Sequence, residues 1–266
     1  MIWLLYLGMR NSGFRMKKIG YSPIFTILLI LFIWELISAL GLFSNALFPT
    51  PYQVSIAFFK LMFSGALMSK ILYSIGIVGV SMLLSFMAAY VFLMGTLKSK
   101  WIDQQLNYCE ALFSPLPGMA ILPLVILWFG VSRSGMLFIM VHAMLWPIWS
   151  QLRIRVLELR MRFATFNKSY AIPRTRRIYY IYFLGSRSVL ISAIKVAWGR
   201  GWRALISAEM IFGMVGSHTG LGWLIYERRM YMDTAGLYAA LMVIALIGII
   251  VERFVKRLEL KYGNHY

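Results

Sequence analysis

Long apolar runs alternate with short polar segments along this chain of 266 residues. A helix that crosses a membrane needs about 20 consecutive, mostly apolar residues, and six stretches meet that length. The pattern therefore predicts an all-α membrane protein with six transmembrane helices. The predicted spans are residues 23–43, 71–97, 104–129, 134–152, 189–213 and 234–252.

Composition supports this interpretation, because 61% of the residues are hydrophobic and only 14% are charged. Soluble domains carry about 25% charged residues. The six spans and their loops take up nearly the whole length, which predicts a single transmembrane domain over 23–253. We expect a cytoplasmic N-terminal extension at 1–22 and a cytoplasmic C-terminal tail at 254–266.

The chain has 27 Lys and Arg against nine Asp and Glu, which gives a formal net charge of +18. These basic residues are dispersed at the ends of the apolar runs, so the charge indicates membrane topology and contact with lipid headgroups rather than nucleic acid. Most of them fall on one side of the membrane if both termini are cytoplasmic. The positive-inside rule therefore places the N and C termini in the cytoplasm.

Several kinds of chemistry lack their minimum residues. A phosphate-binding loop is excluded because the chain contains no Gly-Lys dipeptide, so any ATP is hydrolysed by another protein. The three histidines have no metal-ligand spacing, and Cys109 is the only cysteine. We predict no catalytic residues, no metal site and no cofactor. Glu110, His142 and Glu209 inside spans leave an intramembrane lipid-modifying enzyme as one alternative, and a secondary carrier driven by an ion gradient as another.

A basic, polar segment interrupts the apolar pattern at 154–187. Val156, Leu159, Phe163 and Phe166 recur every three or four residues, which predicts one amphipathic helix along the membrane surface or against a partner. Pro173 then ends this helix, and a second helix is expected to open after it. Such a segment could dock a cytoplasmic protein, or it could lie on anionic lipid.

Four stretches of sequence carry a resemblance to a known family. They are Trp34-Glu35-Leu36 with Phe48-Pro-Thr-Pro-Tyr-Gln-Val54, the proline-rich run from Pro115 to Gly130, Gly199-Arg-Gly-Trp-Arg-Ala-Leu-Ile-Ser-Ala-Glu-Met210, and Thr219-Gly-Leu-Gly-Trp-Leu-Ile225. In this order and spacing the chain resembles the inner-membrane permease subunits of binding-protein-dependent ABC importers. The similar branch is the one that handles nitrate, taurine and sulfonates.

The resemblance implies a type I ABC importer permease fold, with a cytoplasmic coupling helix in the region 154–187 between spans 4 and 5. It implies a non-enzymatic, multi-pass subunit of the cell inner membrane that imports a small solute, with anions favoured. The implied partners are two ABC ATPase subunits, an extracytoplasmic solute-binding protein and a second permease, with a homodimer favoured over a paralogue.

The resemblance also indicates where the ATPase docks, although the local sequence departs from the family pattern. The family's Glu-Ala-Ala falls on Thr165–Asn167, its glycine on Ala171 and its Leu-Pro on Phe183-Leu184. Alanine resists the positive φ that glycine permits, so we expect the turn to be built differently. The predicted docking residues are Lys168, Ser169, Tyr170, Ala171, Ile172, Pro173, Arg174, Thr175 and Arg176.

The fifth span carries ionisable residues at membrane depth. At about 100° per residue, Lys195, Gly199, Trp202, Ile206 and Glu209 share one face, whereas Arg200, Arg203 and Ser207 lie on the adjacent face. Charged groups there must face water or a partner, which favours a pathway role, with an internal ion pair or snorkelling as the alternative.

Prolines 115, 117 and 123 are expected to break the third span, and Pro147 to break the fourth. Freed backbone groups must then line a cavity or find other partners, although a static kink is an equal alternative. The predicted translocation-pathway residues are Pro117, Trp198, Trp202, Arg203, Ser207 and Glu209.

Overall fold

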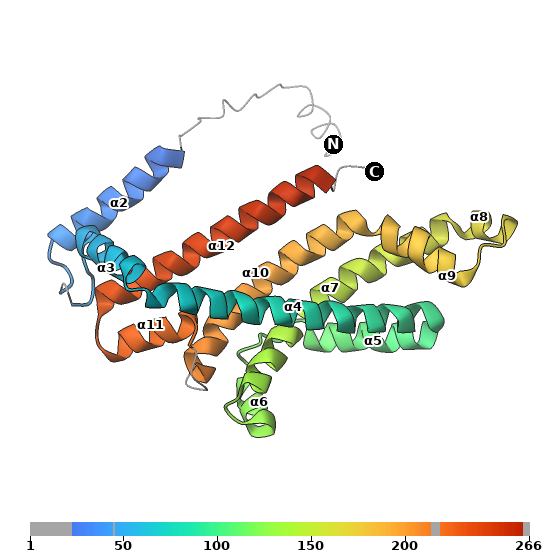
Figure 1. Ribbon diagram of the computed structural model, residues 1–266, viewed down its shortest axis with the longest axis horizontal. Helices are drawn as coiled ribbons and strands as arrows, with labels where there is room; N and C mark the ends of the chain where they lie inside the picture. The colour runs from blue at the N-terminus through green and yellow to red at the C-terminus, as the bar shows by residue number, and fades with distance from the viewer. Residues whose placement is uncertain (1–22, 45, 214–218, 263–266) are drawn as a thin grey trace, which may run out of the picture. The chain divides into compact units, whose positions relative to one another are not determined.

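The computed structural model describes residues 23–44, 46–213 and 219–262, and all the secondary structure in these ranges is helical (Figure 1). The expected extension at 1–22 lies outside the described residues. The chain divides into two units, 1–51 and 52–266. The described helices are α2 (Pro23–Ala39), α3 (Pro51–Phe63), α4 (Ala66–Lys98), α5 (Lys100–Phe113), α6 (Leu122–Phe129), α7 (Arg133–Arg162), α8 (Ala164–Ser169), α9 (Arg174–Arg176), the π-helix η1 (Arg177–Phe183), α10 (Arg187–Phe212), α11 (Leu221–Met230) and α12 (Thr234–Tyr262).

The first unit is built on α2, an apolar helix of 17 residues. After it the chain turns back, and the indole N–H of Trp34 donates a hydrogen bond of 3.0 Å to the carbonyl of Pro49. The same indole meets the ring of Phe48 edge to face, with ring centroids 6.3 Å apart. These contacts explain locally why the Trp-Glu motif and the proline-rich motif occur together.

The second unit is a layer of long helices in which α7 packs against α4 on one side and α10 on the other, and α12 packs beyond α10 (Figure 1). Small residues allow the close approach of α10, as is usual for helices that pack in membranes. A Cβ at Gly201 would overlap the terminal methyl group of Met144, so any larger residue at that crossing would require the Met144 side chain to move. The buried positions of α10 are Ala193, Ala197, Gly201, Trp202, Leu205, Ala208, Glu209 and Phe212.

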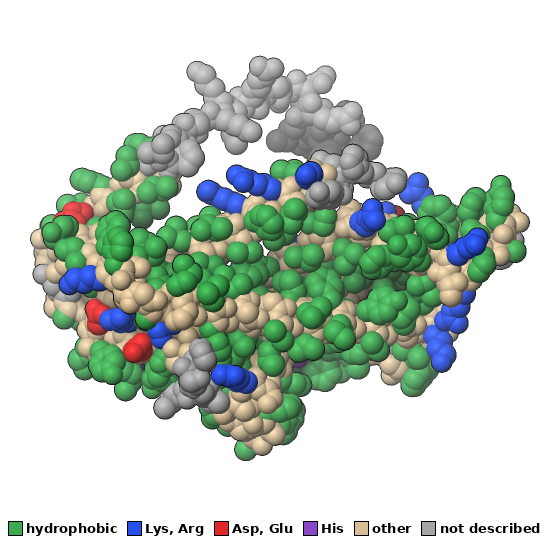
Figure 2. All heavy atoms as spheres, viewed as in Figure 1, with side chains coloured by type: hydrophobic (Ala, Val, Ile, Leu, Met, Phe, Trp, Pro, Cys, Tyr) green, Lys and Arg blue, Asp and Glu red, His purple; other side chains and the backbone are tan. Residues whose placement is uncertain are grey.

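Three of the described helices, α4, α7 and α12, are long and apolar enough to cross a membrane. A fourth results if the segment Arg174–Phe183 and α10, which meet at an angle of 60°, are taken as one span. Apolar side chains cover most of the visible face, whereas Lys and Arg lie mainly at its margins, some near α8 and α9 and others along the upper edge over α12 (Figure 2). The predicted all-α membrane fold is thus confirmed, while the number six stays a prediction.

The predicted third span, 104–129, is not one helix. It is divided into α5 and α6 by an irregular segment at 114–121 that contains Pro115, Pro117 and Gly118. The break was expected from the prolines, since each removes a backbone donor and Gly118 adds freedom.

The expectation for Pro147 was wrong, because α7 runs through it without interruption from Arg133 to Arg162. The flanking Trp146 and Trp149 are buried and contact the ring of Phe92 on α4. Packing on both sides of α7 outweighs the loss of one helical hydrogen bond at the proline.

The polar segment also differs from its prediction. Residues 153–162 form no separate surface helix, because they continue α7, and Val156 and Leu159 are buried against the rest of the layer. The second expected helix is present from Arg174, and it becomes a π-helix at Arg177. In the last helix, α12 continues to Tyr262, so most of the expected tail 254–266 extends this helix.

Candidate functional site

A polar cavity of about 310 Å³ lies where the helix break at 114–121 faces α7 and α10. Backbone and side chains of Ser114–Met119 form one wall. Non-helical backbone at membrane depth is tolerated where it lines a cavity, so the proline-induced break and the cavity explain each other. The other walls are formed by His142 and Ala143 of α7 and by Arg200, Arg203, Ala204 and Ser207 of α10.

The charge of this cavity is positive. Arg200 and Arg203 both line it, and neither forms an ion pair with any described residue. None of the lining residues is acidic. At 1.5 Å rise per residue, Arg200 lies about 20 Å along α10 from its first residue, which is near the middle of the helix. Two arginines without carboxylate partners at that depth indicate a place for an anion or for water.

His142 and Ser207 add neutral polar groups to the same cavity. Both ring nitrogens of His142 are buried; the backbone of Phe113 lies near the ring, but neither nitrogen makes a hydrogen bond of good geometry among the described residues. A buried polar group without a partner is rare in a folded protein, and a ligand or an ordered water is the usual explanation. The cavity therefore offers a hydroxyl, an imidazole and two guanidinium groups to a polar solute.

Three of the six predicted pathway residues, Pro117, Arg203 and Ser207, meet in this cavity. Trp198 and Trp202 do not line it. Their rings stack on each other with centroids 5.2 Å apart, and Trp202 is buried beside Gly248 of α12. Of the two helix faces compared in the sequence, the one that carries Arg200, Arg203 and Ser207 faces the cavity.

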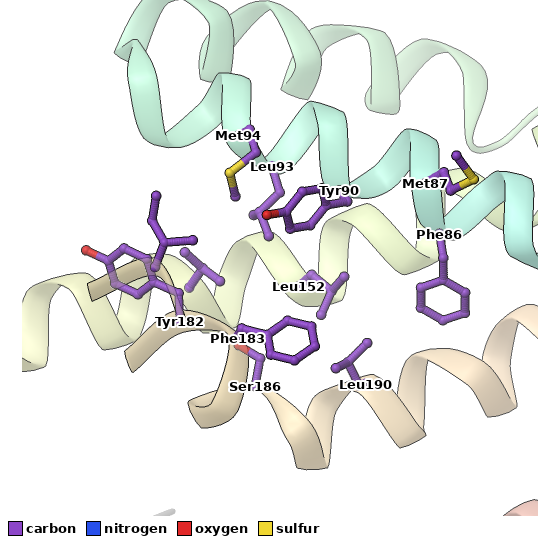
Figure 3. Close-up of a pocket in the computed structure, with 12 residues that line it drawn as sticks. Phe86, Met87, Tyr90, Leu93, Met94, Leu152, Tyr182, Phe183, Ser186 and Leu190 are labelled. Carbon is purple, nitrogen blue, oxygen red and sulfur yellow. The ribbon is translucent and has the colours of Figure 1, made fainter. Parts of the chain in front are cut away.

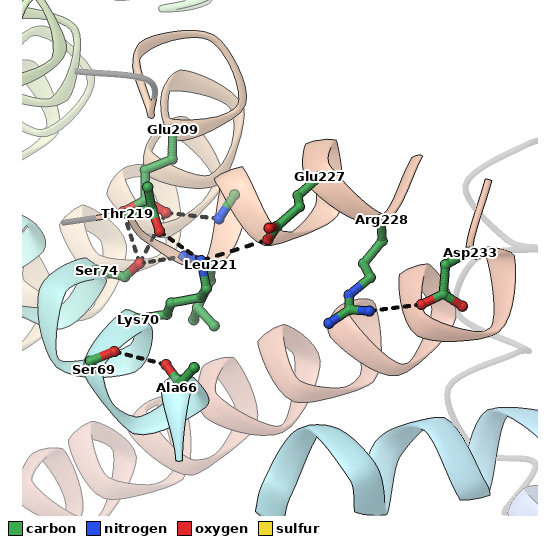
Figure 4. Close-up of polar contacts among 11 residues, drawn as sticks. Ala66, Ser69, Lys70, Ser74, Glu209, Thr219, Leu221, Glu227, Arg228 and Asp233 are labelled. Carbon is green, nitrogen blue, oxygen red and sulfur yellow. Dashed lines mark hydrogen bonds and ion pairs between the residues drawn. The ribbon is translucent and has the colours of Figure 1, made fainter. Parts of the chain in front are cut away.

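Glu209, the sixth predicted pathway residue, is fully buried and lies apart from the cavity lining. The hydroxyl of Ser74 on α4 donates to its carboxylate, with distances of 2.8 and 2.9 Å to the two oxygens (Figure 4). The backbone N–H of Gly222 also donates to the carboxylate, at 2.8 Å, and the N–H of Leu221 donates to the Ser74 hydroxyl at 2.9 Å. We call Ser74, Glu209 and the first residues of α11 the outer latch.

In the outer latch, the N–H groups at the start of α11 find hydrogen-bond acceptors on two other helices, the Ser74 hydroxyl on α4 and the Glu209 carboxylate on α10. The first N–H groups of a helix have no partner within it, and a carboxylate near them is stabilising. A second contact lies beside it, where the ammonium group of Lys70 donates to the Thr219 hydroxyl at 2.6 Å and lies 3.8 Å from the carboxylate of Glu227 (Figure 4). Together these bonds tie α11 to α4 and α10.

Glycines permit the close approach in the outer latch. A Cβ at Gly220 would fall on the Glu209 carboxylate, and one at Gly222 would overlap the backbone carbonyl of Ile206. The two glycines of Thr219-Gly-Leu-Gly222 therefore have a steric explanation, since larger residues at these positions would separate α11 from α10.

At the other end of α7 and α10, the predicted docking residues form a compact projection of α8, a proline turn, α9 and η1. Tyr170, Ile172, Pro173 and Arg176 line one groove of about 690 Å³. Phe163 and Phe166 belong to the same groove, and the rings of Phe166 and Tyr170 are 4.6 Å apart. The side chain of Lys168 lies outside the described residues. The other docking candidates, Ser169, Ala171, Arg174 and Thr175, are exposed.

The expectation that alanine would avoid the left-handed turn was wrong. Ala171 has a φ of 48°, so the chain turns there as a glycine would, and Pro173 follows with φ −55° and ψ 144°. The φ of proline is fixed near this value and the preceding residue is held extended, which leaves Ala171 to make the reversal.

Two ion pairs fix the helices that carry this projection. The guanidinium group of Arg153 on α7 donates two hydrogen bonds, of 2.6 and 2.7 Å, to the carboxylate of Asp103 in the first turn of α5. These hydrogen bonds lower the pKa of Asp103 below its ordinary value. Lys195 of α10 pairs with Glu259 near the end of α12 at 3.1 Å.

Sequence reasoning named His142 only in support of the enzyme alternative, and it did not select Arg200, Ser74 or Lys70 as site residues. Arg200 lies one turn from Arg203, so the helical wheel already grouped the two. Ser74 and Lys70 had no such signal, because their partners Glu209 and Thr219 lie 135 and 149 residues further along the chain.

Comparison with known proteins supports the importer resemblance. The chain is 25% identical over 242 residues to the putative aliphatic sulfonates transport permease protein SsuC of Bacillus subtilis strain 168, which covers 89% of this chain and 86% of that protein. It is 26% identical over 248 residues to the putative aliphatic sulfonates transport permease protein SsuC of Escherichia coli K12, with 92% and 93% covered. It is also 23% identical over 148 residues to the taurine transport system permease protein TauC of Escherichia coli K12, with 56% and 52% covered.

The model of one protein family, described as "Binding-protein-dependent transport system inner membrane component", matches residues 81–263. This stretch includes the cavity, the projection of α8, α9 and η1, and all of the outer latch except Ser74. The long apolar helices fit a multi-pass protein of the inner membrane. Because the match takes in more than half of the chain, this protein belongs to the inner-membrane components of binding-protein-dependent transport systems, the permeases of ABC importers.

Proposed function

We propose that this chain forms the translocation pathway of an ATP-driven importer and that its solute is a small anion, a sulfonate above all. The observation that carries the proposal is the cavity lined by Arg200, Arg203, His142 and Ser207, which holds positive charge and no acidic group. The names of the relatives from Bacillus subtilis and Escherichia coli point to the same class of solute.

The chemistry of the cavity suits a sulfonate. A guanidinium group presents several N–H donors in a plane and pairs well with oxyanions through two parallel hydrogen bonds. Ser207 adds a hydroxyl donor, while Leu116, Met119 and Ala204 supply apolar surface for a short aliphatic chain. In this proposal Glu209 acts indirectly, because the outer latch holds α11 against the end of α10. Trp198 and Trp202 support α10 through their packing.

We further propose that the energy comes from ATPase subunits docked on the projection at 164–184. The sequence lacks a phosphate-binding loop, and the projection joins α7 directly to α10, the two helices that line the cavity. Movement of a docked ATPase would reach the cavity through these two rigid helices. Alternating access then follows if the two helices have two stable arrangements.

The assembly that fits this proposal has two copies of the permease, two ATPase subunits and an extracytoplasmic solute-binding protein. Six spans, with both termini in the cytoplasm, follow if α2 and the broken pair α5 and α6 also cross the membrane. The basic residues near α8 and α9 then lie on the cytoplasmic side, as the positive-inside rule requires.

Disulfide or bifunctional crosslinking tests the docking. Cys109 is the only cysteine, so a Cys109→Ser background allows single cysteines at Tyr170 or Thr175. We expect both to crosslink to a co-expressed ATPase, whereas a cysteine at Met232, which is highly exposed in the turn between α11 and α12, should not. Absence of crosslinks from both sites in an active complex contradicts the docking proposal.

Uptake measurements separate the importer from its alternatives. Proteoliposomes are prepared with the permease, its ATPase and the solute-binding protein. They should accumulate labelled taurine or ethanesulfonate only when ATP is present on the side of the membrane where the ATPase is bound. A secondary carrier would retain transport when the nucleotide site of the ATPase is disabled. A lipid-modifying enzyme would change the lipid composition without moving either solute.

A further inference from the structure

A second pocket, of about 290 Å³, lies among α4, α7, η1 and α10 (Figure 3). Its walls are apolar and come from residues such as Phe86, Leu93, Leu152, Phe183 and Leu190. The exception is Ser186, whose hydroxyl is buried and makes no hydrogen bond among the described residues. The proposed transport pathway makes no use of this pocket.

A small basic pocket of about 140 Å³ adjoins the apolar one, since Ile178 and Tyr182 line both. Three arginines, Arg160, Arg174 and Arg177, line the basic pocket. None of them forms an ion pair within the part of the chain that the structure describes; Arg160 acts on Asp103 only at longer range, and that carboxylate is already paired with Arg153. Three unpaired guanidinium groups around one space favour an anionic group, which would form charge-assisted hydrogen bonds with them.

The dimensions match one leaflet of a bilayer. Leu97 of α4 lies at the basic pocket, and Phe86 of the same helix lies at the far end of the apolar one. Eleven residues of helix correspond to about 16 Å, which is close to half of a hydrocarbon core of about 30 Å. The side chains of Met87 and Tyr90 are about half exposed, so the apolar pocket is open along the surface of α4.

We propose that these joined pockets bind one anionic phospholipid, with its phosphate among Arg160, Arg174 and Arg177 and an acyl chain in the apolar pocket. A free phosphate would leave the apolar part unused, and a neutral lipid would leave the arginines without a partner. Under the proposed orientation the lipid comes from the cytoplasmic leaflet.

The position of this lipid gives it a regulatory role. Its acyl chain would contact α4 and α10, while its phosphate would hold Arg174 of α9 and Arg177 of η1. π-Helical segments occur frequently at functional sites, and η1 is the segment that connects the docking turn to α10. A bound lipid would therefore fix the angle at which the projection leaves the helical layer.

Photolabelling of the full chain tests the site without any transport assay. The protein is placed in nanodiscs of phosphatidylcholine that contain a trace of phosphatidylglycerol with a diazirine in its acyl chain, and labelled peptides are mapped by mass spectrometry. We expect labels in 86–94 and 178–190. Unlabelled phosphatidylglycerol should compete at least tenfold better than phosphatidylcholine.

Matched variants separate the two halves of the site. Arg160→Gln with Arg177→Gln should lower labelling of the pocket by roughly tenfold, because each basic residue near a lipid surface contributes measurably to anionic lipid binding. Arg253→Gln with Arg257→Gln, on exposed positions of α12, removes the same charge and should leave labelling unchanged. Leu190→Trp should block the acyl chain, whereas Leu246→Trp, on the exposed side of α12, should not.

Three results would overturn the proposal. One is equal labelling of the arginine variant and its α12 control. Another is crosslinking of the pocket to a second permease copy instead of lipid, which would make it a subunit interface. The last is unchanged lipid labelling together with loss of ATPase co-purification from the Arg160 and Arg177 variant, which would assign the arginines to the ATPase. Gel filtration and thermal unfolding of each variant exclude misfolding as the cause.

Discussion

The Ser74 hydroxyl and the Glu209 carboxylate meet at 2.8 and 2.9 Å in the interior of the protein, although 135 residues separate them in the chain. This contact joins α4 to α10, and the N–H groups of Leu221 and Gly222 join α11 to both. The outer latch is therefore a bridge among three helices rather than a local cap.

Ser74→Ala is expected to lower the free energy of unfolding by about 1–3 kcal/mol, because it leaves a buried N–H of Leu221 and one side of Glu209 without partners. Glu209→Gln should act in the same direction. Thermal unfolding in detergent measures the effect. Ser69→Ala is the matched control, since that hydroxyl is exposed and bonds only the Ala66 carbonyl in its own helix. Equal melting temperatures for Ser74→Ala and Ser69→Ala would contradict the latch.

Gly220→Ala and Gly222→Ala are expected to be at least as destabilising as loss of the Ser74 hydroxyl. The added methyl groups overlap the Glu209 side chain and the backbone of Ile206, and overpacking of this kind costs about 1–3 kcal/mol. Gly79→Ala on α4 is the control, because a Cβ there meets nothing within 4 Å and should leave stability equal or slightly higher. A neutral result at Gly220 would mean that α11 does not approach Glu209 so closely.

Arg203→Gln is expected to reduce uptake of labelled taurine at least tenfold in the reconstituted importer, since the cavity loses a charged donor for the anion. Arg203→Lys keeps the charge but not the planar donor pair, so its loss should be smaller. Arg253→Gln, on exposed α12, controls for net charge. ATPase activity is measured alongside, and a variant that loses hydrolysis and uptake together would indicate failed coupling rather than a lost solute contact.

The sequence was sufficient for features that depend on neighbours along the chain. The helix break follows from Pro115 and Pro117, whereas Pro123 lies in the first turn of α6. Arg203 and Ser207 share a helix face because they lie four residues apart. Of the six pathway residues predicted by these local rules, three line the cavity. The same rules predicted a turn between two helices, with Pro173 ending the first helix.

Features that depend on tertiary packing were not predictable in this way. Pro147 was expected to break α7, but the buried Trp146 and Trp149 both pack against Phe92 of α4, and the helix stays continuous. Glu209 shared a face with Trp202 on the helical wheel, which gave no indication of Ser74 on another helix. The apolar periodicity of 153–162 was correct, yet it described the buried face of a long helix instead of a surface helix.

The Asp103 and Arg153 pair makes a pH-dependent contribution to stability. Arg153 lowers the pKa of Asp103, so this contribution is fully present above the ordinary carboxyl value near 3.8 and is lost as the pH falls through the lower value in the folded protein. Asp103→Asn should lower the melting temperature at neutral pH. The difference from the original protein should shrink as the pH falls toward 3. Glu158→Gln, whose carboxylate pairs with Arg155 at an exposed position, should show a smaller difference throughout.

Ala171→Gly is expected to stabilise the docking turn by up to about 1 kcal/mol, because glycine adopts a φ of 48° without the strain that a Cβ brings. Ala171→Val should destabilise it, since β-branched residues tolerate positive φ poorly. Ala164→Gly provides a control of opposite sign, because that residue begins α8 and glycine lowers helix stability. Melting temperatures and the yield of the Thr175 crosslink to the ATPase measure both effects. If Ala171→Gly and Ala164→Gly lowered both readouts equally, Ala171 would not hold the left-handed conformation, and the turn would lose the geometry on which the docking proposal depends.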